Sequence, residues 1–349
     1  MNAMNQDKPL AITMGDPAGI GPEIILKSFA QQPELMRNCF VVGDMAVMRQ
    51  HAHILGFSLN LAAIESTSQL ASLSSQALPV LQAGPSQRVE LGQVSAQAGR
   101  MAADAVVWAA KAALRCEVAA VVTAPLHKKA LSLAGIQHPG HTELLQALAA
   151  EHLGVSVAQV PVRMMLTSPG LSTVLVSIHV SLRQAIEAVT QAQVLETLQI
   201  TQRSWLQLHG RAPRMVVAGL NPHAGEEGLF GLEEIQEIGP AIAQAQQLGM
   251  QVLGPYPPDT VFMDAHSPSG QATTDVVIAM YHDQGLIPVK YLGLAHGVNQ
   301  TLGLPFVRTS PDHGTAFGIA GQGVADHSSF MAAVRVARGE RLGEGLVSA

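Results

Sequence analysis

Short apolar runs alternate with longer segments of helical periodicity along most of the chain. Buried strands of a parallel sheet appear as continuous apolar runs, because helices cover both faces of such a sheet. The predicted strands are residues 9–15, 39–44, 118–124, 172–180, 214–220 and 274–281. The predicted helices are residues 100–116, 181–199 and 232–249, the second of which begins with the capping box Ser181 and Gln184. The pattern predicts an α/β fold.

Histidines lie at the ends of three of the predicted strands. His179 ends one strand, His223 follows another in the segment NPHAG, and His282 follows a third. Ligands of open α/β sheets bind beyond the carboxyl ends of the strands, so these side chains are expected at one edge. A single histidine there is usually structural, but three at equivalent positions favour a metal site. Neutral imidazoles suit Zn²⁺, Co²⁺ or similar ions, with coordination positions left open for a substrate.

Polar groups in two further segments indicate an anion site. The segment PGHTELL starts a helix near His141 and Thr142. A helix start offers free N–H groups to phosphate or carboxylate, although Thr142 as a plain N-cap is the alternative. Three further polar residues follow His282 in sequence: Lys290, Asn299 and Arg308. The two cationic side chains, Lys290 and Arg308, either line an anion site or form ordinary ion pairs.

Composition narrows the class of protein. The 349 residues are 48% hydrophobic and 13% charged, which suits a globular protein of two domains or one large domain. The net charge of -6, without a basic run, disfavours nucleic acid as a partner. Only Cys39 and Cys116 are present, which fits a reducing cytoplasm. No apolar run approaches about 18 residues, so no membrane association is expected.

Seven ordered blocks carry a family resemblance. They are TMGDPAGIGPEI, VTAPLHKKAL, GHTELL, NPHAGEEGLFG, YHDQGLIPVKYLG, GVNQTLGLPFVRTSPDHGTAF and IAGQGVAD. Together they resemble the 4-hydroxythreonine-4-phosphate dehydrogenase (PdxA) family over roughly residues 12 to 330. The resemblance implies a two-domain fold like that of isocitrate and isopropylmalate dehydrogenases, with the active site in the interdomain cleft. A discontinuous nucleotide-binding domain would comprise residues 1–138 and 308–349. Residues 139–307 would bind substrate and metal and form a homodimer whose active sites are shared.

The resemblance also implies roles for individual residues. The expected metal ligands are His179, His223 and His282. The expected substrate-binding residues are His141, Thr142, Lys290, Asn299 and Arg308. The expected cofactor-binding residues lie in the loop 312–323 and are His313, Gly314, Thr315 and Gly321. This family binds its dinucleotide without a GxGxxG motif, which the chain also lacks. Gly318 and Gln322 depart from the family pattern and leave the choice of NAD or NADP open.

The expected reaction is NAD(P)-dependent oxidation of 4-phosphohydroxy-L-threonine at its 3-hydroxyl, assisted by Zn²⁺, Mg²⁺ or Co²⁺. The product is a β-keto acid that decarboxylates to 3-amino-2-oxopropyl phosphate, in pyridoxal 5'-phosphate (vitamin B6) biosynthesis. Lys290 or Asp259 is expected as the base, and Asp283 is expected to orient an imidazole. Three alternatives stay open: a related dehydrogenase of a phosphorylated sugar acid or dihydrodiol, a metal-independent acyl- or phosphotransferase, and a non-catalytic metal-binding protein.

Overall fold

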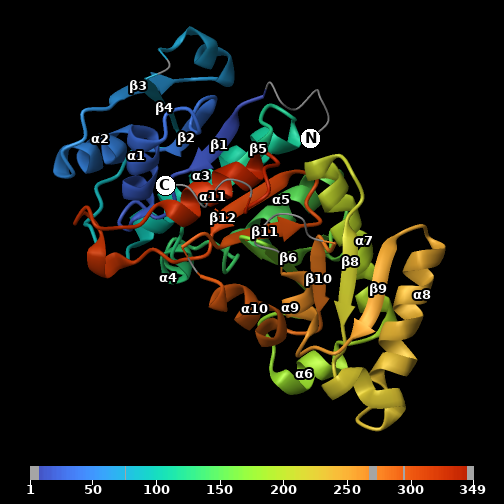
Figure 1. The fold of residues 1–349 in the computed structure, drawn as a ribbon. Helices are drawn as coiled ribbons and strands as arrows, with labels where there is room; N and C mark the ends of the chain where they lie inside the picture. The colour runs from blue at the N-terminus through green and yellow to red at the C-terminus, as the bar shows by residue number, and fades with distance from the viewer. Residues whose placement is uncertain (1–7, 75, 267–272, 294, 344–349) are drawn as a thin grey trace. The chain divides into compact units, whose positions relative to one another are not determined.

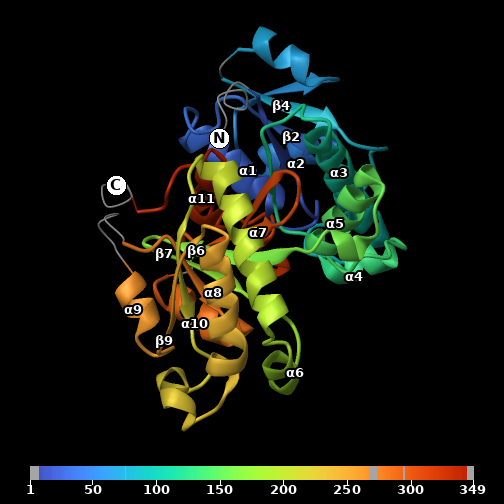
Figure 2. The ribbon, with the colours of Figure 1, turned by 90° about the vertical axis from the view of Figure 1, so that its right-hand side faces the viewer.

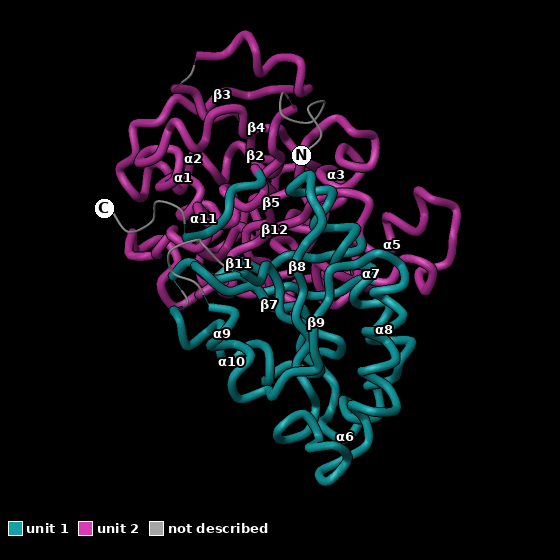
Figure 3. The backbone as a smooth tube through the Cα atoms, turned by 45° about the vertical axis from the view of Figure 1, so that its right-hand side comes forward, with its two compact units in different colours: residues 1, 162–303, 339–349 teal, residues 2–161, 304–338 magenta. Residues whose placement is uncertain are grey.

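The chain folds into two compact units (Figure 3). The computed structural model describes residues 8–343 except 75, 267–272 and 294. Within that range, unit 1 contains residues 162–303 and the segment from Gly339, and unit 2 contains the chain up to Pro161 and residues 304–338. These compact units divide the described chain at 161/162 and 303/304, and the functional domains expected to divide at 138/139 and 307/308 stay a prediction. The last described residues, 339–343, belong to unit 1.

Unit 2 is a parallel sheet with helices between its strands (Figure 1). The strand order is β3-β4-β2-β1-β5-β12, and each neighbouring pair of these strands is parallel. The strands are β1 (Leu10–Thr13), β2 (Cys39–Gly43), β3 (Asn60–Ile64), β4 (Ala77–Gln82), β5 (Ala120–Thr123) and β12 (Val307–Pro311). The α-helices are α1 (Gly21–Gln31), α2 (Met45–Ile54), α3 (Ala96–Leu114), α4 (Lys128–Leu133), α5 (His141–Leu153) and α11 (Ser328–Ala337). Three 3₁₀ turns are η2 (Thr67–Ser72), η3 (Val157–Gln159) and η6 (Phe317–Ile319).

Unit 1 has a mixed sheet in the strand order β11-β6-β7-β10-β8-β9. Strand β6 is antiparallel to both of its neighbours, and β7, β10, β8 and β9 are parallel. The strands are β6 (Arg163–Ser168), β7 (Leu171–Leu175), β8 (Arg214–Ala218), β9 (Gln251–Tyr256), β10 (Val276–Ala279) and β11 (Val298–Leu302). The α-helices are α6 (Leu182–Glu187), α7 (Gln191–His209), α8 (Gly239–Gln247), α9 (Val261–Ala265) and α10 (His282–Tyr291). Two further turns are η4 (Pro222–Gly228) and the π-helical turn η5 (Glu234–Ile238).

Helices cover both faces of the unit 1 sheet, and alternate residues of each strand pack on opposite faces. Val276 and Ile278 of β10 belong to a core that includes residues of α7 and α8. Val277 and Ala279 belong to a second core with residues of α9 and α10. Figure 2 shows α7 and α8 side by side. Covering on both faces explains why these strands appear as continuous apolar runs, and it confirms the α/β class.

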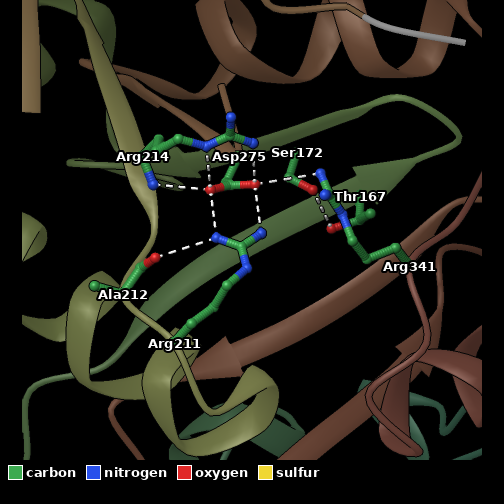
Figure 4. Close-up of polar contacts among 7 residues, drawn as sticks. All are labelled: Thr167, Ser172, Arg211, Ala212, Arg214, Asp275 and Arg341. Carbon is green, nitrogen blue, oxygen red and sulfur yellow. Dashed lines mark hydrogen bonds and ion pairs between the residues drawn. The ribbon is translucent and has the colours of Figure 1, made fainter. Parts of the chain in front are cut away.

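A buried carboxylate holds the segment that contains Arg341 to the rest of unit 1 (Figure 4). Asp275 directly precedes β10, and its side chain is fully buried. The Arg211 guanidinium donates to both carboxylate oxygens at 2.8 Å, and Arg214 donates at 3.1 Å. Arg341, in the segment returning from unit 2, lies 3.3 Å from the same carboxylate. One acidic side chain therefore joins three separate segments of unit 1.

Two of the three predicted helices are interrupted. Residues 181–199 form α6 and then α7, because Thr190 caps a new helix by accepting a hydrogen bond from the Gln193 amide at 3.3 Å. The capping box at Ser181 is confirmed. Residues 232–249 form η5 followed by α8. Lys290 lies in the last turn of α10.

Candidate functional site

The three candidate metal ligands lie in unit 1 beyond the ends of adjacent parallel strands. Strand β10 lies between β7 and β8 in the sheet. His179 follows β7, His282 follows β10 as the first residue of α10, and His223 follows β8 within η4. Since parallel strands end at the same edge, the predicted placement of the three histidines beyond one edge of the sheet is confirmed. Strand β7 ends at Leu175, so His179 stands in a connecting segment rather than at the strand end.

The local geometry pairs two of these histidines. The ring centroids of His179 and His282 are 5.7 Å apart. The Nδ1 of His282 lies 2.8 Å from a carboxylate oxygen of Asp283, which is the imidazole partner expected from the sequence. The His223 ring instead lies 6.1 Å from the ring of Phe230. Across the residues whose placement is described, no three His, Cys, Asp or Glu side chains are gathered closely enough to hold a metal ion.

An open hollow of about 740 Å³ lies beside this edge of the sheet. His223, Asp259 and Asp283 line it together with Tyr281, and its remaining wall is largely apolar. Asp259, one of the two candidate bases, therefore shares a cavity with one of the candidate metal ligands. Tyr281 was not among the predicted site residues. Its position directly before His282, at the end of a predicted strand, was the available signal.

The donor set fits a divalent metal by its chemistry. The three imidazoles offer the nitrogen ligands that Zn²⁺ and Co²⁺ prefer, and the carboxylates of Asp259 and Asp283, which line the hollow with His223, offer the oxygen ligands that Mg²⁺ prefers. The carboxylate of Asp283 can fix the tautomer of the His282 ring by accepting a hydrogen bond from the proton of Nδ1, which leaves the lone pair on Nε2.

The other candidate substrate residues of unit 1 lie on different elements. Lys290 is exposed, eight positions after His282 in the same helix. Asn299 is half-buried on β11 and pairs with Leu166 of β6.

The structure places the candidate anion-binding residues of unit 2 in a desolvated environment. Helix α5 begins at His141 with Gly140 as its N-cap, so Thr142 is not the cap. The Arg308 guanidinium is buried on β12 and donates to the Thr123 hydroxyl at 2.7 Å. Burial lowers the pKa of Arg308 to about 10. Burial, with a smaller contribution from the charge of Arg308, holds the pKa of His141 well below its usual range. A neutral imidazole close to a buried cation suits an anionic substrate group.

The predicted cofactor loop folds against the first loop of unit 2. Thr315 is buried, and its carbonyl accepts a hydrogen bond from the Ile20 amide at 3.0 Å. His313 and Gly314 lie just before it, and Gly321 has a φ of +75°, which favours glycine. The ring of Phe317 stacks on His127, with centroids 5.0 Å apart.

Sequence reasoning missed two residues of this region, Asp16 and His127. Asp16 is fully buried and accepts a hydrogen bond from the Ala18 amide at 2.9 Å. The signal in the sequence was the position of each residue, since Asp16 follows β1 and His127 follows β5.

Comparison with known proteins identifies the family. Residues 35–337 match the family described as pyridoxal phosphate biosynthetic protein PdxA. The chain belongs to the PdxA family. The resemblance inferred from the sequence is therefore confirmed, and the family assignment covers residues of both units.

Three relatives show how far this similarity extends. A 4-hydroxythreonine-4-phosphate dehydrogenase of Beijerinckia indica is 48% identical over 93% of this chain and 92% of its own length. A D-threonate 4-phosphate dehydrogenase of Salmonella typhimurium is 42% identical over 95% of this chain and 98% of its own. The crystal structure of a 4-hydroxythreonine-4-phosphate dehydrogenase from Klebsiella pneumoniae is 41% identical, covers 95% of this chain and 98% of its own, and superposes with a TM-score of 0.83. These relatives are dehydrogenases of small phosphorylated acids. Among the described helices of the chain, none is long and apolar enough to cross a bilayer.

Proposed function

We propose that the protein is an NAD(P)-dependent dehydrogenase that oxidises 4-phosphohydroxy-L-threonine in pyridoxal 5'-phosphate biosynthesis. The supporting observation is that the chain, which is similar over 93% of its length to a 4-hydroxythreonine-4-phosphate dehydrogenase, also has a histidine after each of three adjacent parallel strands. The proposed metal ligands are His179, His223 and His282. The metal-independent transferase weighed from the sequence offers no role for these three side chains.

The proposed reaction begins at the 3-hydroxyl group of the substrate. The hydroxyl proton passes to a base, Asp259 or Lys290, while the hydride on the same carbon passes to NAD⁺ or NADP⁺. The resulting β-keto acid loses CO₂, and protonation of the remaining carbanion gives 3-amino-2-oxopropyl phosphate. When bound, a divalent ion (Zn²⁺, Mg²⁺ or Co²⁺) supplies Lewis-acid stabilisation of negative charge on the substrate oxygen.

The remaining residues bind and orient the two reactants. Anion anchoring is assigned to His141, Thr142, Lys290, Asn299 and Arg308. Burial of the Arg308 guanidinium strengthens its attraction for an anion, because the local dielectric is low. The nicotinamide cofactor is assigned to the loop residues His313, Gly314, Thr315 and Gly321.

The proposal includes a cytoplasmic homodimer with shared active sites. Several large apolar side chains of unit 1 are exposed in one short segment: Leu229, Phe230, Leu232 and Ile235. Exposed apolar side chains this close together in sequence are typical of a surface that another chain covers.

D-Threonate 4-phosphate is the second candidate substrate. It is favoured by the 42% identity to a relative named for it. The two compounds share a carboxylate, a 3-hydroxyl and a terminal phosphate, and differ in having an amino or a hydroxyl group at the 2-position. The same oxidation is therefore possible for either compound, and only the contacts to the 2-substituent separate them.

A substrate panel tests the proposal. Both compounds, and a cyclic dihydrodiol, are offered with NAD⁺ or NADP⁺ after chelation and after addition of Zn²⁺, Mg²⁺ or Co²⁺. We expect absorbance at 340 nm to rise with 4-phosphohydroxy-L-threonine and to depend on added metal. His223→Ala should abolish turnover, and Arg308→Ala should raise KM for phosphorylated substrates more than for an unphosphorylated analogue. Undiminished activity under chelation would refute the metal site, and preference for D-threonate 4-phosphate would reassign the substrate.

A further inference from the structure

The loop that carries His223 has an unusual backbone. His223, Ala224, Glu226 and Glu227 all have positive φ values, between 43° and 53°, and Gly225 among them has a φ of 82°. A left-handed conformation costs about 1–2 kcal/mol for each residue other than glycine. The conformation of η4 therefore persists only because the surrounding residues hold it, and such strain is commonly found at functional sites.

Glu234 provides much of that restraint. Its side chain is only 4% exposed although it bears a carboxylate. One oxygen accepts hydrogen bonds from the Leu220 and Asn221 amides at 2.7 Å each, and the other accepts from the Asn221 side chain at 2.9 Å. These bonds fix the two residues that lead into Pro222 and His223. The carboxylate also packs so closely on the loop that a Cβ at Gly225 would lie 2.8 Å from it.

Gln284 also holds the residues that lead into this loop. Its amide nitrogen donates to the Gly219 carbonyl at 2.7 Å, and its amide oxygen accepts from the Met280 amide at 2.7 Å. Gly219 follows β8, and Met280 follows β10. The ends of these two strands, which lead to His223 and His282, are therefore joined through one side chain of α10.

We propose that Glu234 is a positioning residue for the metal site. Its buried carboxylate holds the backbone of Leu220 and Asn221 and thereby fixes the direction in which His223 leaves β8. The neighbouring Glu233 accepts a hydrogen bond from the Asn221 side chain at 2.7 Å, whereas the Leu220 and Asn221 amides both donate to Glu234. This inference rests on the proposed function only in taking His223 as a metal ligand.

The test compares three variants of the full-length protein. Glu234→Ala removes the acceptor, Glu234→Gln keeps its shape without its charge, and Glu233→Gln is the matched control. Zinc affinity is measured by competition with a chromophoric chelator, well below the melting temperature of each variant. Substitution of a residue that orients a metal ligand typically weakens metal affinity by about 10–100-fold. We expect a loss in that range for Glu234→Ala, a smaller loss for Glu234→Gln, and a change of less than about threefold for Glu233→Gln.

Two further measurements separate positioning from general stability. Hydrogen exchange at the Leu220 and Asn221 amides should accelerate at least about tenfold in Glu234→Ala and stay unchanged in Glu233→Gln. Excess zinc should restore kcat in Glu234→Gln, because the ligands themselves are intact.

Unchanged exchange in a folded Glu234 variant would overturn the positioning role. Unchanged zinc affinity would do so as well, if the wild-type protein binds zinc. If the wild-type protein takes up no divalent metal, the proposed function fails, and faster exchange in Glu234→Ala would still support the restraint of the loop. If Glu234→Ala does not fold, the zinc affinity and hydrogen exchange of Glu234→Gln test the positioning role instead.

Discussion

Burial sets the charge of several single residues in unit 2. Arg308 and His141 are both affected by desolvation, which keeps the imidazole neutral beside a buried guanidinium. Desolvation also raises the pKa of Asp16 to about 6, against smaller opposing effects of the Ala18 amide and of His127. An acid with a raised pKa is destabilising once it ionises, because the unfolded chain releases the proton more easily.

This raised pKa predicts a pH dependence of stability. The folded protein holds the Asp16 proton up to about pH 6, whereas the ordinary pKa of an aspartate carboxyl is 3.8, so stability falls as pH rises between these two values. Two pKa units correspond to about 3 kcal/mol. Asp16→Asn keeps the acceptor for Ala18 and removes the ionisation. Its free energy of unfolding relative to wild type should therefore rise between pH 4.5 and pH 7.5 by about 2 kcal/mol, since that range covers about 1.5 of the two pKa units.

Urea unfolding at several pH values measures this difference. Asp264→Asn, at an exposed position of α9, is the control and should show no such trend. A constant difference between Asp16→Asn and wild type across the pH range would contradict the prediction.

The sequence predicted which residues lie beyond the sheet edge better than how their side chains meet. His179, His223 and His282 were placed correctly, because each follows a strand that is visible as an apolar run. The rotation of the His223 ring toward Phe230 depends on the left-handed backbone of η4, which no local pattern indicates. Asp16 was missed because its chemistry arises from burial between segments distant in sequence.

At the scale of elements, the hydrophobic pattern predicted buried strands correctly. It did not predict the points at which one helix ends and another begins. The predicted strand 274–281 contains β10, whose residues are buried on both faces. The segment 181–199 has a continuous helical period, yet Thr190 caps a second helix within it. Thr190 was a signal for this second start, because threonine is a preferred N-cap residue. The continuous apolar period of the segment nevertheless indicated a single helix.

The contacts of Asp275, which join three segments of unit 1, predict how much this one carboxylate contributes to stability (Figure 4). Burial alone would raise its pKa, but hydrogen bonds from Arg211 and Arg214 outweigh this and hold the pKa well below its usual range. Asp275→Asn should lower the free energy of unfolding at pH 7 by about 3 kcal/mol, since a neutral amide at this buried position leaves the surrounding guanidinium groups without their counter-charge. The half-exposed arginines keep the loss near the lower end of the usual range.

Chemical denaturation at pH 7 measures this loss, with Glu117→Gln as the control. Glu117 forms an exposed ion pair with Arg115, so its substitution should cost less than about 1 kcal/mol. Because the pKa of Asp275 is depressed, its stabilisation is present above the unfolded pKa and disappears as pH falls through the folded pKa. The difference should therefore persist at neutral pH and shrink only in strong acid.

At the scale of the whole molecule, the proposed homodimer is expected to form through the exposed apolar segment of unit 1 that runs from Leu229 to Ile235. Leu229 is 73% exposed and Ile235 is 54% exposed. The double variant Leu229→Glu, Ile235→Glu should dissociate the dimer, because burying two carboxylates without partners costs several kcal/mol each. Sedimentation velocity at micromolar concentration measures the shift from dimer to monomer.

Leu133→Glu is the control for this experiment. It lies in α4 of unit 2, is similarly exposed at 54%, and should leave the dimer intact. A monomeric wild-type protein, or a double variant that stays dimeric, would show that the interface is not formed by this segment.

The discontinuity of unit 2 has a consequence during synthesis on the ribosome. Strand β12 pairs with β5, and α11, whose Phe330 is fully buried, belongs to the same unit. Both elements are translated after all of residues 162–303. Until then the nascent amino-terminal part exposes the open edge of β5 and lacks part of its core. Chains that terminate before residue 304 should therefore aggregate or engage chaperones, and protection from proteolysis should be acquired late in translation.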